Sequence, residues 1–272
     1  MERKGVGVSL VAYKMSEEYL TRLSDSLDLC DLVYKVVVDN SPTNKSKKDF
    51  ENRNWTYIHK PENIGFGSAH NHIYKLFSQN SKYHLVINPD VYFFEDIIND
   101  LVKFMELNNE AGAVTPSIYY PDGSLQRLQK LLPSPLGWVM RRFMKGSSFL
   151  KKYNYNFELR FSKEQDIFKF PYMSGCFMLL RNSVIDKIDM FDENIFMYGE
   201  DTDLSRKLWI NNTPPYYYGK VKAYHVFEKG SHKSLKLLLI AIKSTIYYFN
   251  KWGWFDSNRN KINNQCLDQF NK

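Results

Sequence analysis

Cysteine is scarce in this sequence. The chain has 272 residues and three cysteines, Cys30, Cys176 and Cys266, and no two of them form a CxxC pair. Disulfide frameworks and structural zinc sites are built from even or clustered sets of cysteines, so this odd and scattered set disfavours both. We therefore expect the protein to be made and retained in the reducing cytoplasm.

Long apolar runs are also missing. A membrane-spanning helix needs about 18 to 20 consecutive apolar residues, whereas the longest candidate, LLLIAI at 237–242, ends at Lys243. The opening sequence MERKGVGVSLVAYK has too short an apolar run for a signal peptide and continues into strand-like sequence. Neither a P-loop (GxxxxGK followed by Ser or Thr) nor a GxGxxG fingerprint occurs, so the corresponding nucleotide-binding interpretations are weak.

The charge of the chain is unevenly distributed. Its formal net charge of +7 comes from 37 Lys and Arg residues against 30 Asp and Glu. Residues 127–163 hold nine basic residues and one acid, and residues 229–272 hold eight and two; the remaining body, with 20 basic and 27 acidic residues, is at −7. A uniformly basic coat for nucleic acid fits this distribution poorly, and a localised anionic partner fits it better.

Apolar runs alternate with helical patterns in the first half of the chain. We expect strands at 6–13, 34–38, 55–59 and 83–87, and helices at 17–29, 67–78 and 94–107. Strands separated by helices indicate a parallel α/β sheet, whose ligands bind beyond the carboxyl ends of the strands. This rule directs attention to Asp39-Asn40 and Asn88-Pro89-Asp90. Later strands are expected at 111–120, 170–180 and 216–227, with helices from about 200 and over 234–252.

A carboxylate follows the fourth expected strand. In the segment INPDV (87–91), Asp90 would face the ligand crevice and could bind a divalent cation through its oxygens. Asn-Pro-Asp is also good turn chemistry, so a structural role is the alternative. His225 ends another expected strand, where a histidine is usually structural, although neutral imidazole is a common metal ligand.

Three acids stand close together in the segment FMYGEDTDLSRKLW (196–209). Glu200, Asp201 and Asp203 open an expected helix. Acids in a first turn complement the helix dipole and cap the helix. Three acids beside a glycine exceed that need, and crowding raises the pKa of a carboxyl group, which suits a general base. The residues alone leave both interpretations open.

Seven segments follow one another along the chain. They are VSLVAYK (8–14), VVVDNSPT (36–43), NIGFGSAHN (63–71), INPDV (87–91), YPDGSLQRLQKLLPSP (120–135), SGCFMLLRNSVIDKIDMFDENIFMYGEDTDLSRKL (174–208) and HVFEKGSHKS (225–234). In this order they resemble a family 2 glycosyltransferase of the GT-A fold, and most of all the rhamnosyltransferase-like branch that builds bacterial surface polysaccharides. The resemblance implies an α/β protein with a Rossmann-like nucleotide-binding sheet, an acceptor-binding C-terminal half and a terminal amphipathic helix.

The resemblance also implies roles for single residues. Those implied to bind the nucleotide and the donor sugar are Ala12, Tyr13, Asp39, Asn40, Asn63, Gly65, Asn71, Asn88 and Asp90. Asp201 is implied to be the catalytic base and Glu200 to support placement of the acceptor. Gly175, in the SGC turn, is implied to leave room for the acceptor.

A divalent metal, Mn²⁺ or Mg²⁺, is implied on the donor diphosphate, bound by Asp90 and His225. The family's DxD motif has an acid where this chain has Asn88, so only one carboxylate is offered, although an asparagine oxygen is still a usable ligand. A single base predicts direct displacement with inversion at the anomeric carbon. The resemblance favours dTDP-rhamnose as the donor, ahead of UDP-sugars, and a hydroxyl of a growing, lipid-linked glycan as the acceptor.

We expect residues 1–228 to form one GT-A domain, with a nucleotide-sugar-binding half at 1–110 and an acceptor-binding half at 111–228. Residues 229–272 would form a basic, amphipathic helical extension. Its apolar positions are Leu238, Ile242, Ile246 and Phe249, followed by Trp252 and Trp254. Such a helix either lies on the inner face of an anionic membrane or packs on the protein core.

Two other functional classes stay open. A protein that binds single-stranded nucleic acid would use the basic segments and the aromatic residues, but this leaves the acid cluster unexplained, and we expect no nucleic-acid partner. A catalytically inactive protein would bind a sugar nucleotide without turnover. Among enzymes, a nucleotidyltransferase of related fold is the alternative, and the chain shows no glycine-rich N-terminal signature to support it.

Overall fold

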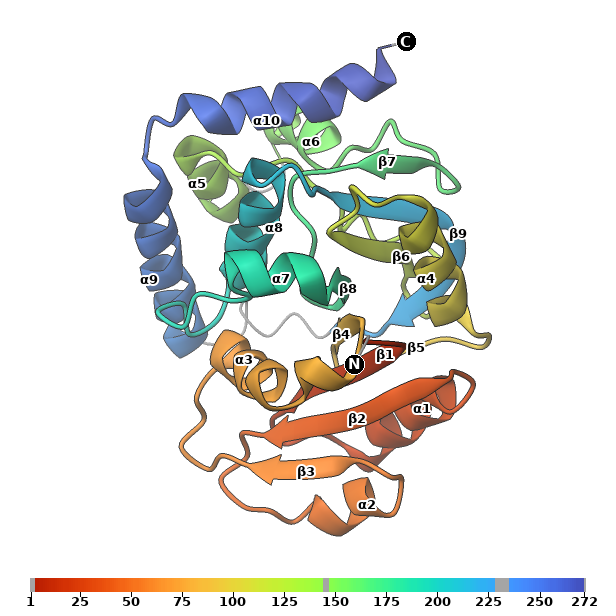
Figure 1. The fold of residues 1–272 in the computed structure, drawn as a ribbon. Helices are drawn as coiled ribbons and strands as arrows, with labels where there is room; N and C mark the ends of the chain where they lie inside the picture. Colours follow the sequence, from red (N-terminus) through yellow and green to blue (C-terminus); the bar gives the residue numbers. More distant parts are fainter. Residues whose placement is uncertain (1–2, 144–146, 228–234, 272) are drawn as a thin grey trace.

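One nine-stranded sheet runs through the computed structural model, which describes residues 3–143, 147–227 and 235–271 (Figure 1). The strand order is β3-β2-β1-β4-β8-β6-β9-β5, and β7 pairs with β9. The strands are β1 (Val6–Ala12), β2 (Leu32–Asp39), β3 (Thr56–His59), β4 (Tyr83–Ile87), β5 (Val91–Tyr92), β6 (Ala113–Tyr119), β7 (Ile167–Lys169), β8 (Phe177–Arg181) and β9 (Pro215–His225). The α-helices are α1 (Glu17–Leu27), α2 (Lys47–Glu51), α3 (Phe66–Phe77), α4 (Ile97–Leu107), α5 (Pro135–Phe143), α6 (Ser148–Phe157), α7 (Asn182–Ile188), α8 (Glu200–Ile210), α9 (Leu235–Trp252) and α10 (Ser257–Leu267).

The first four strands are parallel. Strand β1 pairs with both β2 and β4, and β2 pairs with β3. The register places Ala12 beside Asp39 and Asp39 beside His59, so the carboxyl ends of these strands meet at one edge. The prediction of a parallel α/β sheet is confirmed for this half. Beyond β4 the sheet becomes mixed, because β8 runs antiparallel to both β4 and β6.

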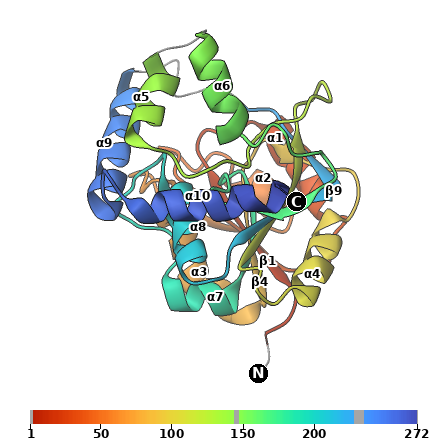
Figure 2. The same ribbon diagram turned by 90° about the horizontal axis from the view of Figure 1, so that it is seen from above.

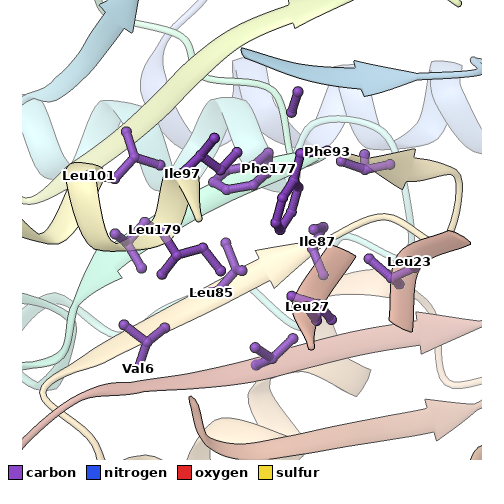
Figure 3. Packing of buried hydrophobic residues seen from close by; sticks show 14 of the residues in the cluster. Val6, Leu23, Leu27, Leu85, Ile87, Phe93, Ile97, Leu101, Phe177 and Leu179 are labelled. Carbon is purple, nitrogen blue, oxygen red and sulfur yellow. The ribbon is translucent and has the colours of Figure 1, made fainter. Parts of the chain in front are cut away.

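The hydrophobic core explains why these segments form helices and strands. In α1, Leu20, Leu23 and Leu27 recur at helical spacing and are buried against the sheet. Figure 3 shows Leu23 and Leu27 beside the strand residues Leu85 and Ile87. Together with Ile97, Leu101 and Phe177, these side chains fill the same cluster. This shared cluster packs α1 and α4 against the central strands of the sheet.

The expected strand at 170–180 is wrong in its first half. Strand β8 starts at Phe177, and residues 170–176 form an irregular segment with a single backbone bridge between Tyr172 and Lys130. The apolar pattern misled because Phe170 and Met173 are buried without being in a strand. The neighbouring short strand β7 and the helices α5 to α7 were not anticipated.

The C-terminal helices are attached to the body by buried polar contacts. The carboxylate of Asp203 on α8, which is fully buried, accepts hydrogen bonds from Trp252 Nε1 at 2.7 Å and Lys251 Nζ at 3.0 Å. Arg206 pairs with Asp256 just beyond α9. Both views show α9 along one flank of the molecule beside α5, with α10 crossing the end (Figures 1 and 2).

Helix α9 therefore packs on the protein along one side. Phe249 is buried and Trp252 bonds to Asp203, as the packed alternative predicts. Ile246 on the other side is 45% exposed. Within the described ranges, no helix combines the length and the apolar character needed to cross a membrane.

Candidate active site

Polar residues gather at the carboxyl ends of β1 and β2, which we call the strand-end edge. This is where ligands of a parallel sheet are expected to bind. Asp39 is buried, and its carboxylate accepts hydrogen bonds from the backbone N–H of Ser41 at 2.9 Å and the hydroxyl of Tyr57 at 2.7 Å. The N–H of Asn40 donates to the carbonyl of Ala12 at 2.8 Å, and Asn40 Oδ1 is buried without a partner among the described residues. These contacts fix the strand ends and leave an acceptor oxygen for a ligand.

Tyr13 and the loop before α3 border the same edge. Tyr13 is 52% exposed, so its ring is free to cover a planar ligand. Asn63 Oδ1 accepts from the N–H of Gly65, and the carbonyl of Gly65 accepts from Asn40 Nδ2. Gly65 has φ +87°, and a Cβ there would lie 2.5 Å from the carbonyl oxygen of Phe196, so only glycine fits.

Asn71, on α3, has structural contacts of its own. Its Nδ2 donates to the carbonyl of Phe191 at 2.8 Å, and its Oδ1 accepts from the N–H of the same residue at 3.0 Å. Nδ2 also contacts Glu193. The amide therefore ties α3 to the loop that precedes α8, and within the described residues its hydrogen bonds go to that loop and not to the other expected donor residues.

Asp90 and His225 meet although they are 135 positions apart. The two-residue strand β5 pairs Val91 with His225, which places the preceding carboxylate beside the ring. His225 Nε2 lies 3.2 Å from Asp90 Oδ1, and the N–H of Phe227 donates to Asp90 Oδ2 at 3.1 Å. Asn88 begins the same turn, its carbonyl accepting from the N–H of Val91 at 3.3 Å, and its own N–H is bonded to the carbonyl of Cys176.

Gln126 determines which nitrogen of His225 carries a hydrogen. Gln126 Nε2 donates to the carbonyl of His225 at 2.6 Å, which identifies the other amide atom as oxygen. That oxygen lies 3.0 Å from His225 Nδ1, so Nδ1 must be the donor. In a neutral ring, Nε2 then directs its lone pair at the carboxylate of Asp90.

Two lone pairs that face each other at 3.2 Å require a positive charge between them, and a divalent cation meets this requirement. Two ligands about 2.1 Å from one octahedral ion lie about 3 Å apart, close to the separation of Nε2 and Oδ1. Across the described residues, no group of three His, Cys, Asp or Glu side chains could hold a metal. The residues therefore fit a cation that takes its remaining ligands from a bound diphosphate or water.

The acid pair lies at the start of α8. Asp201 Oδ1 accepts from the N–H of Thr202 at 2.7 Å, and Oδ2 accepts from the N–H of Gly175 at 3.2 Å and the hydroxyl of Tyr172 at 3.4 Å. Burial raises the pKa of Asp201, while these N–H groups and the charge of Lys130 act in the opposite direction. The carboxylate is thus held in one orientation and made more basic, as a general base requires.

Glu200 is also buried, and burial followed by the charge of Asp201 raises its pKa. Its Oε2 has no hydrogen-bond partner within the described part of the chain. A buried acceptor without a partner is costly unless a ligand hydroxyl or a proton satisfies it. This side chain is therefore ready to accept a hydrogen bond from a bound molecule.

Both acids open onto a cavity of about 400 Å³, which we call the α5–α9 cavity. It lies between α5, α6, the start of α8 and α9. Aromatic residues that line it are Trp138, Tyr153, Phe157, Tyr172, Tyr198, Tyr248 and Phe249. Two cations, Lys130 and Arg141, line it as well. Flat rings with a few polar groups are typical of a small-molecule site.

Cys176 connects the two parts of the site. It is buried in the turn that carries Gly175, and burial raises the pKa of its thiol to about 12; the charges of Asp90 and Asp201 act in the same direction. The N–H of Gly175 in this turn donates to Asp201 at 3.2 Å, and the carbonyl of Cys176 accepts from the N–H of Asn88 at 2.9 Å, so the turn contacts both parts of the site. Gly175 itself has Phe66 and Asp201 as the nearest neighbours of an added Cβ, at 3.3 and 3.7 Å.

Sequence reasoning missed three residues of this site. Gln126 stands in a loop 99 positions from His225, and nothing local in the sequence indicates that they meet. Lys130 and Arg141 were counted in a basic segment but given no role. The one feature of the sequence that could have drawn attention to Lys130 and Arg141 is that their segment is basic while the body of the chain is acidic.

Comparison with known proteins identifies relatives for most of the chain. A family model described as "Glycosyl transferase family 2" matches residues 10–189. The rhamnosyltransferase WbbL of Escherichia coli is 25% identical over 247 residues, covering 85% of this chain and 88% of that protein. The N-acetylglucosaminyl-diphospho-decaprenol L-rhamnosyltransferase of Mycobacterium tuberculosis is 30% identical over 125 residues, covering 46% of this chain and 40% of that protein.

The fold is shared with solved structures. The mannosyltransferase PcManGT of Pyrobaculum calidifontis, in complex with GDP-Man and Mn²⁺, superposes with a TM-score of 0.61 at 16% identity. The match covers 92% of this chain and 64% of that one. At this identity the similarity establishes the architecture alone.

Proposed function

We propose that this chain, which belongs to glycosyl transferase family 2 and is a glycosyltransferase of the GT-A fold, transfers its sugar with inversion of configuration at the anomeric carbon. Asp201 would be the general base. The observation that carries this proposal is the position of Asp201. Its carboxylate is oriented by Gly175 and Thr202 and opens onto the α5–α9 cavity, and the turn at Gly175 also bonds, through the carbonyl of Cys176, to Asn88 two residues before Asp90.

The chemistry follows from these positions. An acceptor hydroxyl in the cavity donates its hydrogen to Asp201 while its oxygen attacks the anomeric carbon of the donor sugar. The bond from that carbon to the diphosphate breaks, its electron pair leaves with the nucleoside diphosphate, and the proton remains on Asp201. One displacement from the side opposite the leaving group inverts the anomeric centre. Glu200 Oε2 accepts a hydrogen bond from a second hydroxyl group of the acceptor.

Asp90 and His225 would hold a divalent metal, with Asn88, at the start of the same turn as Asp90, as a further oxygen ligand. When bound, the cation stabilises negative charge on the departing diphosphate. The 3.2 Å separation and the tautomer fixed by Gln126 support this assignment, as does the Mn²⁺ in the complex of the solved mannosyltransferase.

For the donor, we propose a nucleotide sugar bound along the strand-end edge. Ala12, Tyr13, Asp39 and Asn40 would contact the base and ribose, and Asn63 and Gly65 would lie nearer the sugar. Relatives named as rhamnosyltransferases favour L-rhamnose, carried by dTDP, with UDP-sugars as the alternative.

For the acceptor, we propose a glycan linked to a lipid at an anionic membrane. The helices α5, α6 and α9, which line the cavity, also carry exposed apolar residues. These are Leu136, Val139, Phe149, Leu235, Leu239 and Ile246, with exposures of 45–75%. Lys151, Lys152, Lys236 and Lys243 lie among them, and each lysine near an anionic surface contributes about 1 kcal/mol. Sedimentation with anionic vesicles tests this placement, and absence of binding at low salt would contradict it.

A panel of sugar nucleotides tests the proposed reaction. Purified protein is incubated with dTDP-rhamnose and with UDP-sugars, with Mn²⁺, Mg²⁺ or EDTA, and release of the nucleoside diphosphate is measured together with thermal stabilisation. We expect turnover with one donor, lost with EDTA, and a product of inverted configuration by NMR. Donor binding without turnover under every condition would instead support the catalytically inactive alternative.

A further inference from the structure

Helix α9 holds the segment that carries the acid pair at both of its ends. One side chain of this helix, Lys251, spans the segment: its Nζ donates to the carboxylate of Asp192 at 2.6 Å and to that of Asp203 at 3.0 Å. Glu200 and Asp201 lie between these two anchor points in the sequence. The position of the acid pair therefore depends on a helix that follows it by more than 30 residues.

The same helix also contacts the turn directly before the acids. Ser244 is buried, and its hydroxyl donates to the carbonyl of Met197 at 2.8 Å. The next two residues have positive φ angles, +70° at Tyr198 and +130° at Gly199, and α8 begins at Glu200. A tyrosine in the left-handed region is unfavourable and persists only where the surrounding structure fixes it. The hydrogen bond from Ser244 supplies such a restraint one residue before this conformation begins.

The loop before α3 anchors the same turn from another side. The N–H of Phe66 donates to the carbonyl of Phe196 at 3.1 Å. Adjacent carbonyls of the turn are therefore bound by two different parts of the molecule, Phe196 by α3 and Met197 by α9 (Figure 1). Because the first of these bonds does not involve α9, a change at Ser244 should leave the loop before α3, and with it the proposed donor site, in place.

We propose that Ser244 is a positioning residue for the reaction, because its hold on the Met197 carbonyl sets the direction in which Glu200 and Asp201 point into the α5–α9 cavity. This inference rests on the proposed function, in which Asp201 is the base. The two acids are the first residues of α8, so a rotation of the turn before them moves both carboxylates relative to a bound acceptor. Misplacement of a reacting group by about 1 Å can reduce the rate about 10²-fold.

The test removes this one hydroxyl. In Ser244→Ala we expect kcat to fall about tenfold, with the Kd of the donor, measured by calorimetry, within about twofold of the wild type. Ser244→Thr keeps the hydroxyl and should restore kcat. Ser24→Ala is the matched control: it removes another buried serine hydroxyl, which accepts from Trp55 Nε1 at 3.1 Å on α1, far along the chain from the acid pair. This control should leave kcat unchanged.

The pH profile distinguishes a change in position from a general loss of stability. Burial raises the pKa of Asp201, and a turn that is released from α9 admits water to this carboxyl group. Because Asp201 acts when deprotonated, the acidic limb of kcat/KM should move to lower pH in Ser244→Ala. The limb should stay in place in Ser244→Thr and in Ser24→Ala.

Hydrogen exchange measures the same turn without any turnover. The N–H of Asp203 donates to the carbonyl of Gly199 at 2.9 Å, so exchange over residues 199–203 reports on the first turn of α8. Faster exchange there in Ser244→Ala, with unchanged exchange in β1 and β2, supports the inference. Wild-type kcat, pH profile and exchange in this variant would overturn it, as would equal changes in Ser24→Ala. If Asp201→Asn keeps full turnover, the base assignment fails, and the exchange experiment still decides whether Ser244 holds the turn.

Discussion

The two halves of the active site are built in different ways. The strand-end edge consists of residues at the ends of β1 and β2, and Asp90 follows the adjacent strand β4, so the parallel pairing of adjacent strands positions them. The α5–α9 cavity is lined by residues of α5, α6, α8 and α9, which are far apart in the sequence, and α9 is bonded to α8 through Trp252 and Asp203. The comparison teaches that the proposed donor site is fixed by the sheet, whereas the proposed acceptor site depends on long-range helix packing.

The largest expected effect tests the residue that connects both halves. Asp201→Asn keeps the shape of the side chain but removes the proton acceptor, so kcat should fall by about 10³-fold or more. Because the strand-end edge is unchanged, the Kd of the donor should stay within about twofold, measured by calorimetry. Asp100→Asn is the control, since Asp100 is also an acid in a first helical turn, on α4 away from the site. Unchanged turnover of the Asp201 variant would falsify the base assignment.

The strand-end edge could be predicted from the sequence because its causes are local. An apolar run followed by Asp39-Asn40 or Asn88-Pro89-Asp90 indicates both a strand and the point at which it ends. The pairing of Asp90 with His225 was implied by a family resemblance only, since it depends on the two-residue strand β5, which is too short to produce a periodic pattern.

The cavity could be predicted far less well. Helices α5 and α6 fall in a segment read only as basic and proline-bearing, and the segment before β8 looks like a strand because buried aromatic residues follow one another there. What places Lys130 beside Asp201 is its backbone bridge to Tyr172, a contact across 42 positions that no local pattern encodes. The packing of α9 was one of two open alternatives for the same reason.

A second prediction concerns the proposed metal site, where Gln126, from a loop distant in the sequence, contacts His225. Gln126→Leu removes the acceptor for His225 Nδ1–H, so the ring loses its fixed tautomer. Partners of this kind typically change metal affinity about 10- to 100-fold, and we expect weaker Mn²⁺ binding of that size, titrated by EPR with a bound nucleoside diphosphate. Gln129→Leu, a buried glutamine of the same loop, should leave Mn²⁺ affinity unchanged. Equal affinity in both variants would show that the tautomer does not matter.

A third prediction tests the electrostatic effect of Lys130 on the proposed base. Asp201 acts only when deprotonated, so kcat/KM should fall as the pH drops through its raised pKa. Lys130 lowers that pKa. Lys130→Met should therefore move the acidic limb of the pH profile of kcat/KM to higher pH, measured with the same donor and acceptor as the wild type. Lys130→Arg keeps the charge and should keep the limb in place. A limb that stays fixed in the methionine variant would exclude this coupling.

The smallest effect tests whether the helix-built half of the site is the less stable one. Trp252→Phe removes the hydrogen bond to the buried carboxylate of Asp203, although Lys251 still pairs with it. Loss of a bond to a charged group costs about 2 kcal/mol, and we expect urea unfolding to show this decrease. Hydrogen exchange should increase in α9 before it increases in β1 and β2. Trp254→Phe, which loses only a surface bond to Asn250, should change stability by less than about 0.5 kcal/mol. If exchange in β1 and β2 rises together with that in α9, the two halves unfold as one unit. The sheet-built and helix-built halves would then differ in how they are assembled but not in their stability.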